Sequence, residues 1–220
     1  MNIVRKLHTS VKYPTSIIVK GANILGVEIA RSLLEQGGFV IIIDSESNAS
    51  RKLLDPLITY KNLLVLDFGS IADLSQDLRR LDYIFYFEHK STELVEKIST
   101  QKFLQNSNYL DSMLDLSAKF DAKFLLTTAI RAHQLNISNA QLEYNYGLNN
   151  RSSHTEYIEL EIQRYAESLV QEYREKVGIN SRVLRLGEII GRGTEFGQSS
   201  TLVKLIREGL EGRDLIVPGD

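Results

Sequence analysis

A short turn bounded by two glycines has the residue types of a phosphate-binding site. Gly21 to Gly26 lie between a run of β-branched residues and a segment with helical periodicity. Backbone N–H groups at the start of a helix in that position can hold a pyrophosphate. Asn23 stands where a dinucleotide-binding pattern would have its middle glycine, so the turn also fits glycines that only permit tight helix–strand packing. The predicted binding residues of the turn are Gly21, Asn23, Ile24, Leu25 and Gly26.

An acidic residue after the second apolar run indicates which dinucleotide would bind. Asp44 follows the run 39–43, at about the distance from the glycine turn where a carboxylate hydrogen-bonds an adenosine ribose hydroxyl. The same carboxylate would repel the 2′-phosphate of NADP. The two features together predict NAD as the cofactor.

The elements that would position these residues alternate between strands and helices. The predicted strands are 16–20, 39–43, 63–66, 83–87, 124–126 and 182–186. The predicted helices are 24–36, 106–120 and 153–177, the last opening on a capping box at Ser153 and ending before Gly178. This alternation predicts an α/β fold, a Rossmann-like doubly wound parallel sheet with helices on both faces.

Composition excludes several classes of protein. With 43% hydrophobic and 25% charged residues in a chain of 220, a disordered or coiled-coil protein is excluded. The net charge of −2 predicts neither a nucleic-acid nor a membrane partner. There is no cysteine, and the four histidines are scattered, so we expect no metal site. No apolar run is long enough for a signal peptide or a membrane span, and we expect a cytoplasmic protein.

Six segments carry a resemblance to a known family: 17–26, 64–67, 82–86, the helix opened by Asn106, 185–191 and 202–220. Together they resemble the NAD-dependent epimerase/dehydratase family, the nucleotide-sugar group of extended short-chain dehydrogenases/reductases, nearest to the UDP-glucuronate decarboxylases. The resemblance implies that Asp67 and Phe68 approach the adenine and that a nucleotide sugar is the ligand. It also implies that residues 1–15 are an extension, and that 16–220 form the NAD(P)-binding domain without most of a C-terminal substrate domain.

The same resemblance locates the positions of the family's chemistry. Its members use a Tyr as acid/base, a Lys four residues later and a Ser or Thr that shares the substrate proton. The segment 163–169 resembles the stretch beginning at that Lys, which places Gln163 at the Lys position and Glu159 at the Tyr position. A shift of two residues offers Tyr157 instead. Ala129 stands at the Ser/Thr position, with Thr128 one residue early.

These replacements lead to two hypotheses of different classes. The first is a catalytically inactive member of the family, with a cofactor-sensing or assembly role. The alternative is a divergent nucleotide-sugar epimerase, dehydratase or decarboxylase that uses Tyr157 and Thr128. Glu88 stands where the family has a small residue beside the cofactor, and a carboxylate near a pyrophosphate is unfavourable.

The resemblance also implies a homodimer through the 106–120 and 153–177 helices. Apolar residues at helical spacing in these segments are expected to supply the interface. They are Leu110, Met113, Leu114, Ile162 and Tyr165.

Overall fold

The computed structural model describes residues 12–44, 52–88, 100–129, 154–187, 189–191 and 201–217. The strands are β1 (Thr15–Val19), β2 (Phe39–Ile43), β3 (Leu63–Leu66), β4 (Tyr83–Phe87), β5 (Lys123–Ala129) and β6 (Ser181–Leu186). The helices are α2 (Ile24–Glu35), η1 (Asp55–Leu57), η2 (Phe68–Ser70), α4 (Ile71–Asp77), α5 (Thr100–Phe120), α6 (His154–Lys176) and α7 (Thr201–Leu210).

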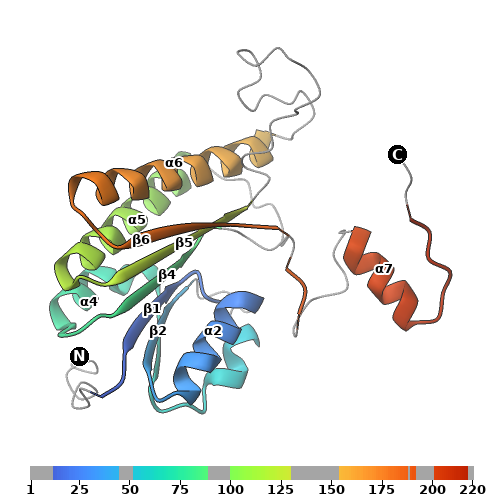
Figure 1. Cartoon of the computed structure of the whole chain (residues 1–220), viewed down its shortest axis with the longest axis horizontal. Helices are drawn as coiled ribbons and strands as arrows, with labels where there is room; N and C mark the ends of the chain where they lie inside the picture. Colours follow the sequence, from blue (N-terminus) through green and yellow to red (C-terminus); the bar gives the residue numbers. More distant parts are fainter. Residues whose placement is uncertain are drawn as a thin grey trace. The chain divides into compact units, whose positions relative to one another are not determined.

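The six strands form one sheet in the order β3-β2-β1-β4-β5-β6 (Figure 1). Every neighbouring pair is parallel. This is the strand order of the Rossmann fold, and it reverses between β1 and β4. The predicted fold class is therefore confirmed. Because all strands run the same way, their carboxyl ends meet at one edge of the sheet.

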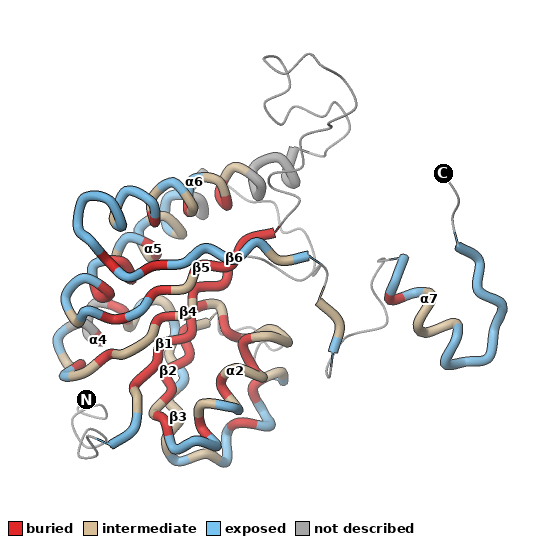
Figure 2. The backbone as a smooth tube through the Cα atoms, in the orientation of Figure 1, coloured by how far each residue is buried: buried red, intermediate tan, exposed pale blue. Residues whose placement is uncertain are grey.

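Apolar side chains on both faces of the sheet form two cores. The colouring of Figure 2 shows that the central strands are largely buried. Successive residues of a strand point to opposite faces, so Ile17 and Val19 join one core and Ile18 the other. The first core is covered by α4, α5 and α6, and the second by α2 (Figure 1). Burial on both faces explains why β1 and β2 read as nearly continuous apolar runs rather than alternating ones.

Three strands, β2, β3 and β4, have the bounds predicted from sequence. The predicted start of α5 at Asn106 is wrong, because the helix begins at Thr100. The preceding segment, 100–105, contains neither glycine nor proline, and it is too polar to show a helical stripe. The end of α6 is as predicted: Gly178 has a φ of 83°, and its N–H donates to the carbonyl of Tyr173. Ser153 lies outside the described residues.

The turn from β1 into α2 depends on two glycines that lie almost in contact. A Cβ on Gly26 would lie 2.3 Å from the carbonyl oxygen of Gly21 and 2.8 Å from its Cα. A Cβ on Gly21 would lie 2.8 Å from Cγ2 of Ile18. The glycines therefore let the first turn of α2 approach β1 closely, whether or not a ligand binds there.

The predicted apolar dimer surface is wrong for four of its five residues. Leu110, Met113, Leu114 and Ile162 are buried within the chain itself, the first three in the core between α5 and the sheet. Only Tyr165 is exposed, with a relative accessibility of 42%. Because these four side chains are buried within the chain, a dimer through α5 and α6 would have to use other residues. A homodimer through these helices stays a prediction.

A tyrosine at the contact of α6 with α5 shares its hydroxyl proton with two carboxylates. The oxygen of Tyr173 lies 2.8 Å from a carboxylate oxygen of Asp111 and 2.8 Å from one of Asp115. Partial burial, reinforced by these two hydrogen bonds, raises the pKa of the Tyr173 hydroxyl above its ordinary value. The contact ties the C-terminal part of α6 to α5.

Residues 188–220 form a second unit, which we describe by itself. Its helix α7 places Val203 on a buried face and ends at Leu210, two residues before Gly212, whose φ is 69°. The N–H of Arg213 donates to the carbonyl of Glu208 in a Schellman-type closure. Across both units, no helix in the described ranges is long and apolar enough to cross a membrane.

We predict that Gly26→Ala destabilises the fold by about 3 kcal/mol, because its Cβ would meet backbone atoms that cannot move aside as a side chain could. Chemical denaturation monitored by circular dichroism measures the loss. Gly187→Ala is the matched control, since its Cβ would have no heavy atom within 4 Å. The free energy of unfolding of this control should stay within about 0.5 kcal/mol of that of the parent chain. Equal effects of the two substitutions would contradict the close approach of the glycines.

We predict that Tyr173→Phe costs about 1 kcal/mol at neutral pH, where the hydroxyl is protonated. The raised pKa favours the neutral hydroxyl in the folded state. Its contribution is complete below the unfolded pKa of about 10 and is lost as the pH rises above it. Urea unfolding at a series of pH values should therefore show the difference between parent and variant shrinking above about pH 10. A difference that stays constant at all pH values would refute this role.

Candidate functional site

The N-terminus of α2 is capped from within the glycine turn. The side-chain oxygen of Asn23 accepts a hydrogen bond from the N–H of Gly26 at 2.8 Å, and its amide nitrogen donates to the carbonyl of Lys20 at 2.7 Å. This explains why an asparagine stands at the position of the missing glycine: it satisfies one of the N–H groups at the helix start. A phosphate bound there would find that N–H already paired.

The two acidic residues expected at the adenosine end lie at one edge of the sheet, because Ile43 pairs with Leu66 and each Asp follows directly. Asp44 accepts a hydrogen bond at 2.7 Å from the N–H of Ala22 in the glycine turn. Asp67 caps η2 by accepting from the N–H of Ser70 at 3.0 Å. Both carboxylates therefore hold local backbone in place.

Phe68, the other residue expected beside the adenine, turns towards α5. Its ring stacks on that of Tyr109, with centroids 4.7 Å apart and an angle of 22° between the planes. Phe68 and Tyr109 both pack against the core covered by α4, α5 and α6. The stacking gives Phe68 a packing role in addition to any contact with a ligand.

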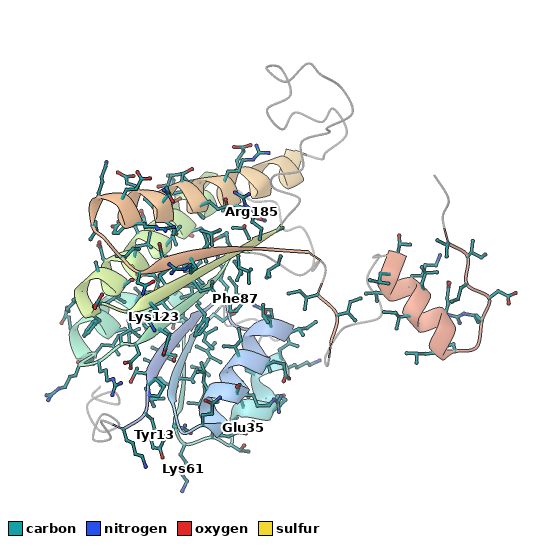
Figure 3. The ribbon with its side chains drawn as sticks, in the orientation of Figure 1. Tyr13, Glu35, Lys61, Phe87, Lys123 and Arg185 are labelled. Atoms are coloured by element: carbon teal, nitrogen blue, oxygen red, sulfur yellow. The ribbon has the colours of Figure 1, made fainter. Side chains whose placement is uncertain are left out.

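An ion pair joins the ends of the two central strands. Lys20 follows β1 and Glu88 follows β4, and the Nζ of Lys20 donates to Oε1 of Glu88 at 2.6 Å. The same ammonium lies 5.3 Å from the ring centroid of Tyr86, within reach of a cation–π interaction. Figure 3 labels Phe87, which precedes Glu88 in the chain. The carboxylate that sequence reasoning placed near a pyrophosphate is thus paired with a cation of this chain.

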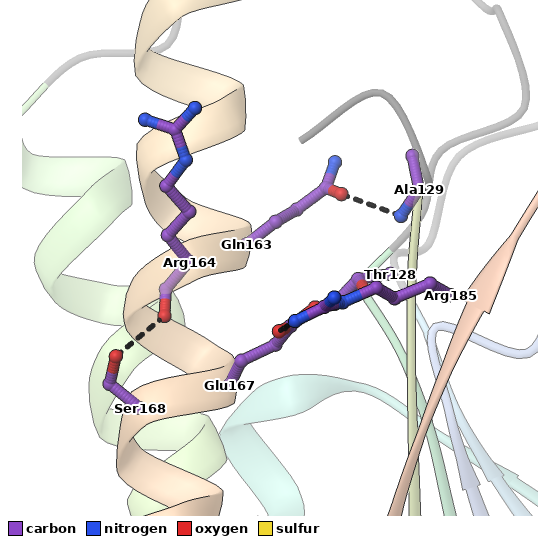
Figure 4. A network of polar contacts seen from close by, with 7 residues as sticks. All are labelled: Thr128, Ala129, Gln163, Arg164, Glu167, Ser168 and Arg185. Carbon is purple, nitrogen blue, oxygen red and sulfur yellow. Dashed lines mark hydrogen bonds and ion pairs between the residues drawn. The ribbon is translucent and has the colours of Figure 1, made fainter. Parts of the chain in front are cut away.

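The structure brings together the two positions that the family resemblance assigned to Lys and Ser/Thr. Gln163 lies on α6, and its Oε1 accepts a hydrogen bond at 2.7 Å from the backbone N–H of Ala129 at the end of β5 (Figure 4). Gln163 is 2% exposed and Ala129 is 8% exposed. Neither side chain supplies a group that could donate or accept a substrate proton at ordinary pH. The pair satisfies a buried backbone donor.

One helical turn further along α6, Glu167 accepts a hydrogen bond from the hydroxyl of Thr128, the residue before Ala129. Thr128, fully buried, donates from its Oγ1 to Oε1 of Glu167 at 2.6 Å (Figure 4). Arg185 of β6 is paired with Thr128 in the sheet register and donates from Nη2 to Glu167 Oε2 at 2.7 Å. The hydrogen bond with Glu167 raises the pKa of Arg185. This triad fastens α6 to the carboxyl ends of β5 and β6.

The remaining predicted positions, Tyr157 and Glu159, lie in α6, but their side chains lie outside the described residues. Glu159 is four residues before Gln163 in the helix, so the two share a face. Among the side chains described, no three His, Asp or Glu residues gather into a group that could hold a metal ion.

A family model decides the assignment of this chain. The model described as the NAD dependent epimerase/dehydratase family matches residues 17–220. The chain belongs to this family. No curated protein sequence matches it significantly.

Solved structures of epimerases and dehydratases share the fold of this family member. A UDP-N-acetylglucosamine 4-epimerase from Methanobrevibacter ruminantium, in complex with UDP-N-acetylmuramic acid, has a TM-score of 0.64 and 20% identity over 96% of this chain and 67% of its own. A dTDP-glucose 4,6-dehydratase from Bacillus anthracis, in complex with NAD, has a TM-score of 0.65 and 14% identity over 94% and 64%. A UDP-glucuronic acid 4-epimerase from Bacillus cereus, in complex with NAD, has a TM-score of 0.62 and 14% identity over 94% and 66%. The chain thus spans about two thirds of their length.

The described residues fit the family's NAD only in part. Gly21 and Gly26 place no side chain between β1 and the first turn of α2, as a phosphate-binding turn requires. At the end of β4, however, Glu88 is 7% exposed and places a carboxylate beside the turn. A dinucleotide phosphate would meet negative charge there. These residues do not fit a bound pyrophosphate while the pair between Lys20 and Glu88 is closed.

Sequence reasoning assigned no role to three residues that prove central here. Lys20, Glu167 and Arg185 each form an ion pair at the carboxyl edge of the sheet. All three lie inside segments that resemble the family, but the resemblance named no partner for any of them. The partner of Lys20, Glu88, is distant in the sequence, and the register of β1 against β4 brings the two together.

We predict that Gln163→Met destabilises the protein by about 1–3 kcal/mol, because it preserves the shape of the side chain and leaves the buried N–H of Ala129 without an acceptor. Thermal and chemical unfolding measure the loss. Gln171→Met, at an exposed position of the same helix, is the matched control and should change stability by less than about 0.5 kcal/mol. A Gln163→Met protein as stable as the control variant would show that the bond to Ala129 contributes nothing.

Proposed function

We propose that this protein is a catalytically inactive member of the NAD-dependent epimerase/dehydratase family. It keeps the dinucleotide-binding fold for cofactor sensing or assembly. The observation that carries the proposal is the hydrogen bond between Gln163 and Ala129. It joins the positions of the family's Lys and Ser/Thr through groups that have no acid–base chemistry near neutral pH.

The loss of these groups would remove most of the family's rate acceleration. A general acid or base contributes typically about 10²- to 10⁴-fold, and the residue that activates it contributes further. Gln163 carries no charge with which to lower the pKa of a neighbouring hydroxyl. Ala129 offers no hydroxyl to share a substrate proton. Both replacements support a protein that does not turn over a sugar nucleotide.

The divergent enzyme, the second hypothesis, would need the hydroxyl of Thr128. That hydroxyl donates to Glu167, which is also held by Arg185. The hydrogen of Thr128 is therefore directed into α6. A catalytic role would require the triad to open, at the cost of a buried charge-assisted hydrogen bond. For this reason we favour the inactive protein.

We predict no turnover when the purified chain is incubated with NAD and UDP-glucuronate or UDP-glucose. Chromatography of the products measures conversion of the sugar nucleotide, and absorbance at the band of reduced nicotinamide measures reduction of NAD. An active UDP-glucose 4-epimerase is run in parallel as the positive control. Unchanged sugar nucleotide after long incubation is the expected result. Conversion at a rate within about a hundredfold of the control enzyme would overturn the proposal, because it is faster than the loss of both groups allows.

A further inference from the structure

Lys20 and Glu88 lie at the place where open parallel sheets bind ligands. In such sheets the ligand binds outside the carboxyl ends of the strands, at the point where the strand order reverses. The order reverses here between β1 and β4, whose residues Val19 and Tyr86 are paired in register. Lys20 directly follows β1, and Glu88 follows β4. We call the carboxyl ends of β1 and β4 the switch point.

The backbone at Lys20 is held in a conformation that is unusual for lysine. Its φ of 54° lies in the left-handed region, which is unfavourable for any residue with a Cβ. Two hydrogen bonds hold it there: its N–H donates to the carbonyl of Ile43 at 2.7 Å, and its carbonyl accepts from Asn23. The glycine turn thus fixes the direction from which the Lys20 side chain leaves β1.

The side chains of the pair are mostly withdrawn from solvent. Lys20 is 19% exposed and Glu88 is 7% exposed, and the contact between them is 2.6 Å. The N–H of Glu88 donates to the carbonyl of Thr127 at 3.0 Å, which extends the pairing of β4 with β5 by one residue. Separating the two charges without a replacement partner would leave a carboxylate unpaired in a buried place, which is costly.

We propose that the ion pair of Lys20 and Glu88 is an internal latch that controls access of a nucleoside diphosphate to the switch point. Glu88 repels the diphosphate and at the same time occupies the ammonium that would bind it. When the pair opens, Lys20 donates to the phosphate oxygens in a charge-assisted hydrogen bond. The latch and the proposed function share one assumption, that the ligand binds at the carboxyl edge of the sheet, and the latch rests on the proposed function only to that extent.

The test measures the dissociation constant of ADP for each of three forms of the chain by isothermal titration calorimetry at one salt concentration. Adenosine, which lacks phosphate, is titrated in the same way as the control ligand. Three forms of the full chain are used: the parent, Glu88→Gln, and the double variant Lys20→Gly/Glu88→Gln. Glutamine keeps the shape of Glu88 and removes its charge. Glycine suits the left-handed backbone at position 20, so the double variant removes the ammonium and retains the turn.

We expect Glu88→Gln to bind ADP at least about tenfold more tightly than the parent, because a repulsive charge is removed and Lys20 is released to the phosphates. The double variant should lose this gain, and adenosine should show none. Equal ADP affinity in the parent and in Glu88→Gln would overturn the latch, as would a gain that survives the loss of Lys20.

Glu88→Ala provides the same comparison if Glu88→Gln does not fold. Failure of both variants to fold would assign the ion pair to the stability of the sheet and would likewise overturn the latch. The two proposals fail separately. Turnover of a UDP-sugar by the parent chain counts against the inactive assignment, whereas the latch is decided by the ADP affinities alone.

Discussion

A polar group buried at the end of a parallel strand costs about 1–3 kcal/mol when it has no hydrogen-bond partner. Six parallel strands bring many such groups to one edge, where helices and turns also begin. In this protein several of the described groups at that edge are paired within the chain itself, although the buried Oγ1 of Thr127 in β5 has no partner. The contacts are those of Asp44 with Ala22, Asn23 with Gly26, Lys20 with Glu88, Gln163 with Ala129, and Thr128 with Glu167.

These contacts support the proposal that the family's fold is kept here without its chemistry. Gln163, which the resemblance aligns with the family's Lys, places a hydrogen-bond acceptor where a buried N–H needs one. Glu167 then anchors the same helix to two strands through Thr128 and Arg185. These hydrogen bonds secure the position of α6 relative to the sheet.

Most of the fold could be predicted from the sequence, because strands buried on both faces read as unbroken apolar runs such as 39–43 and 83–87. The start of α5 was missed because the segment 100–105 is mostly polar and its two apolar residues are too few to show a helical period. The assignment of Leu110 and Met113 to an interface was wrong for a related reason. Helical spacing identifies an apolar stripe, but it does not say whether that stripe covers the sheet or a second chain.

The site could be predicted only where it follows local motifs. Gln163 and Ala129 were aligned with the family by short matching segments, and the structure places them in contact. The pair of Lys20 and Glu88 was beyond sequence reasoning, since it depends on the register of β1 against β4 and on the left-handed backbone at Lys20. Long-range pairs of charged residues are set by topology, which no local pattern encodes.

A crystal structure of the full chain grown with saturating NAD and UDP-glucuronate would test most directly whether this edge serves internal contacts in place of chemistry. The account predicts that Gln163 keeps its 2.7 Å hydrogen bond to the N–H of Ala129 and that Thr128 still donates to Glu167. The contrary result is a structure in which Gln163 and Thr128 have left these partners and contact the bound cofactor or the sugar.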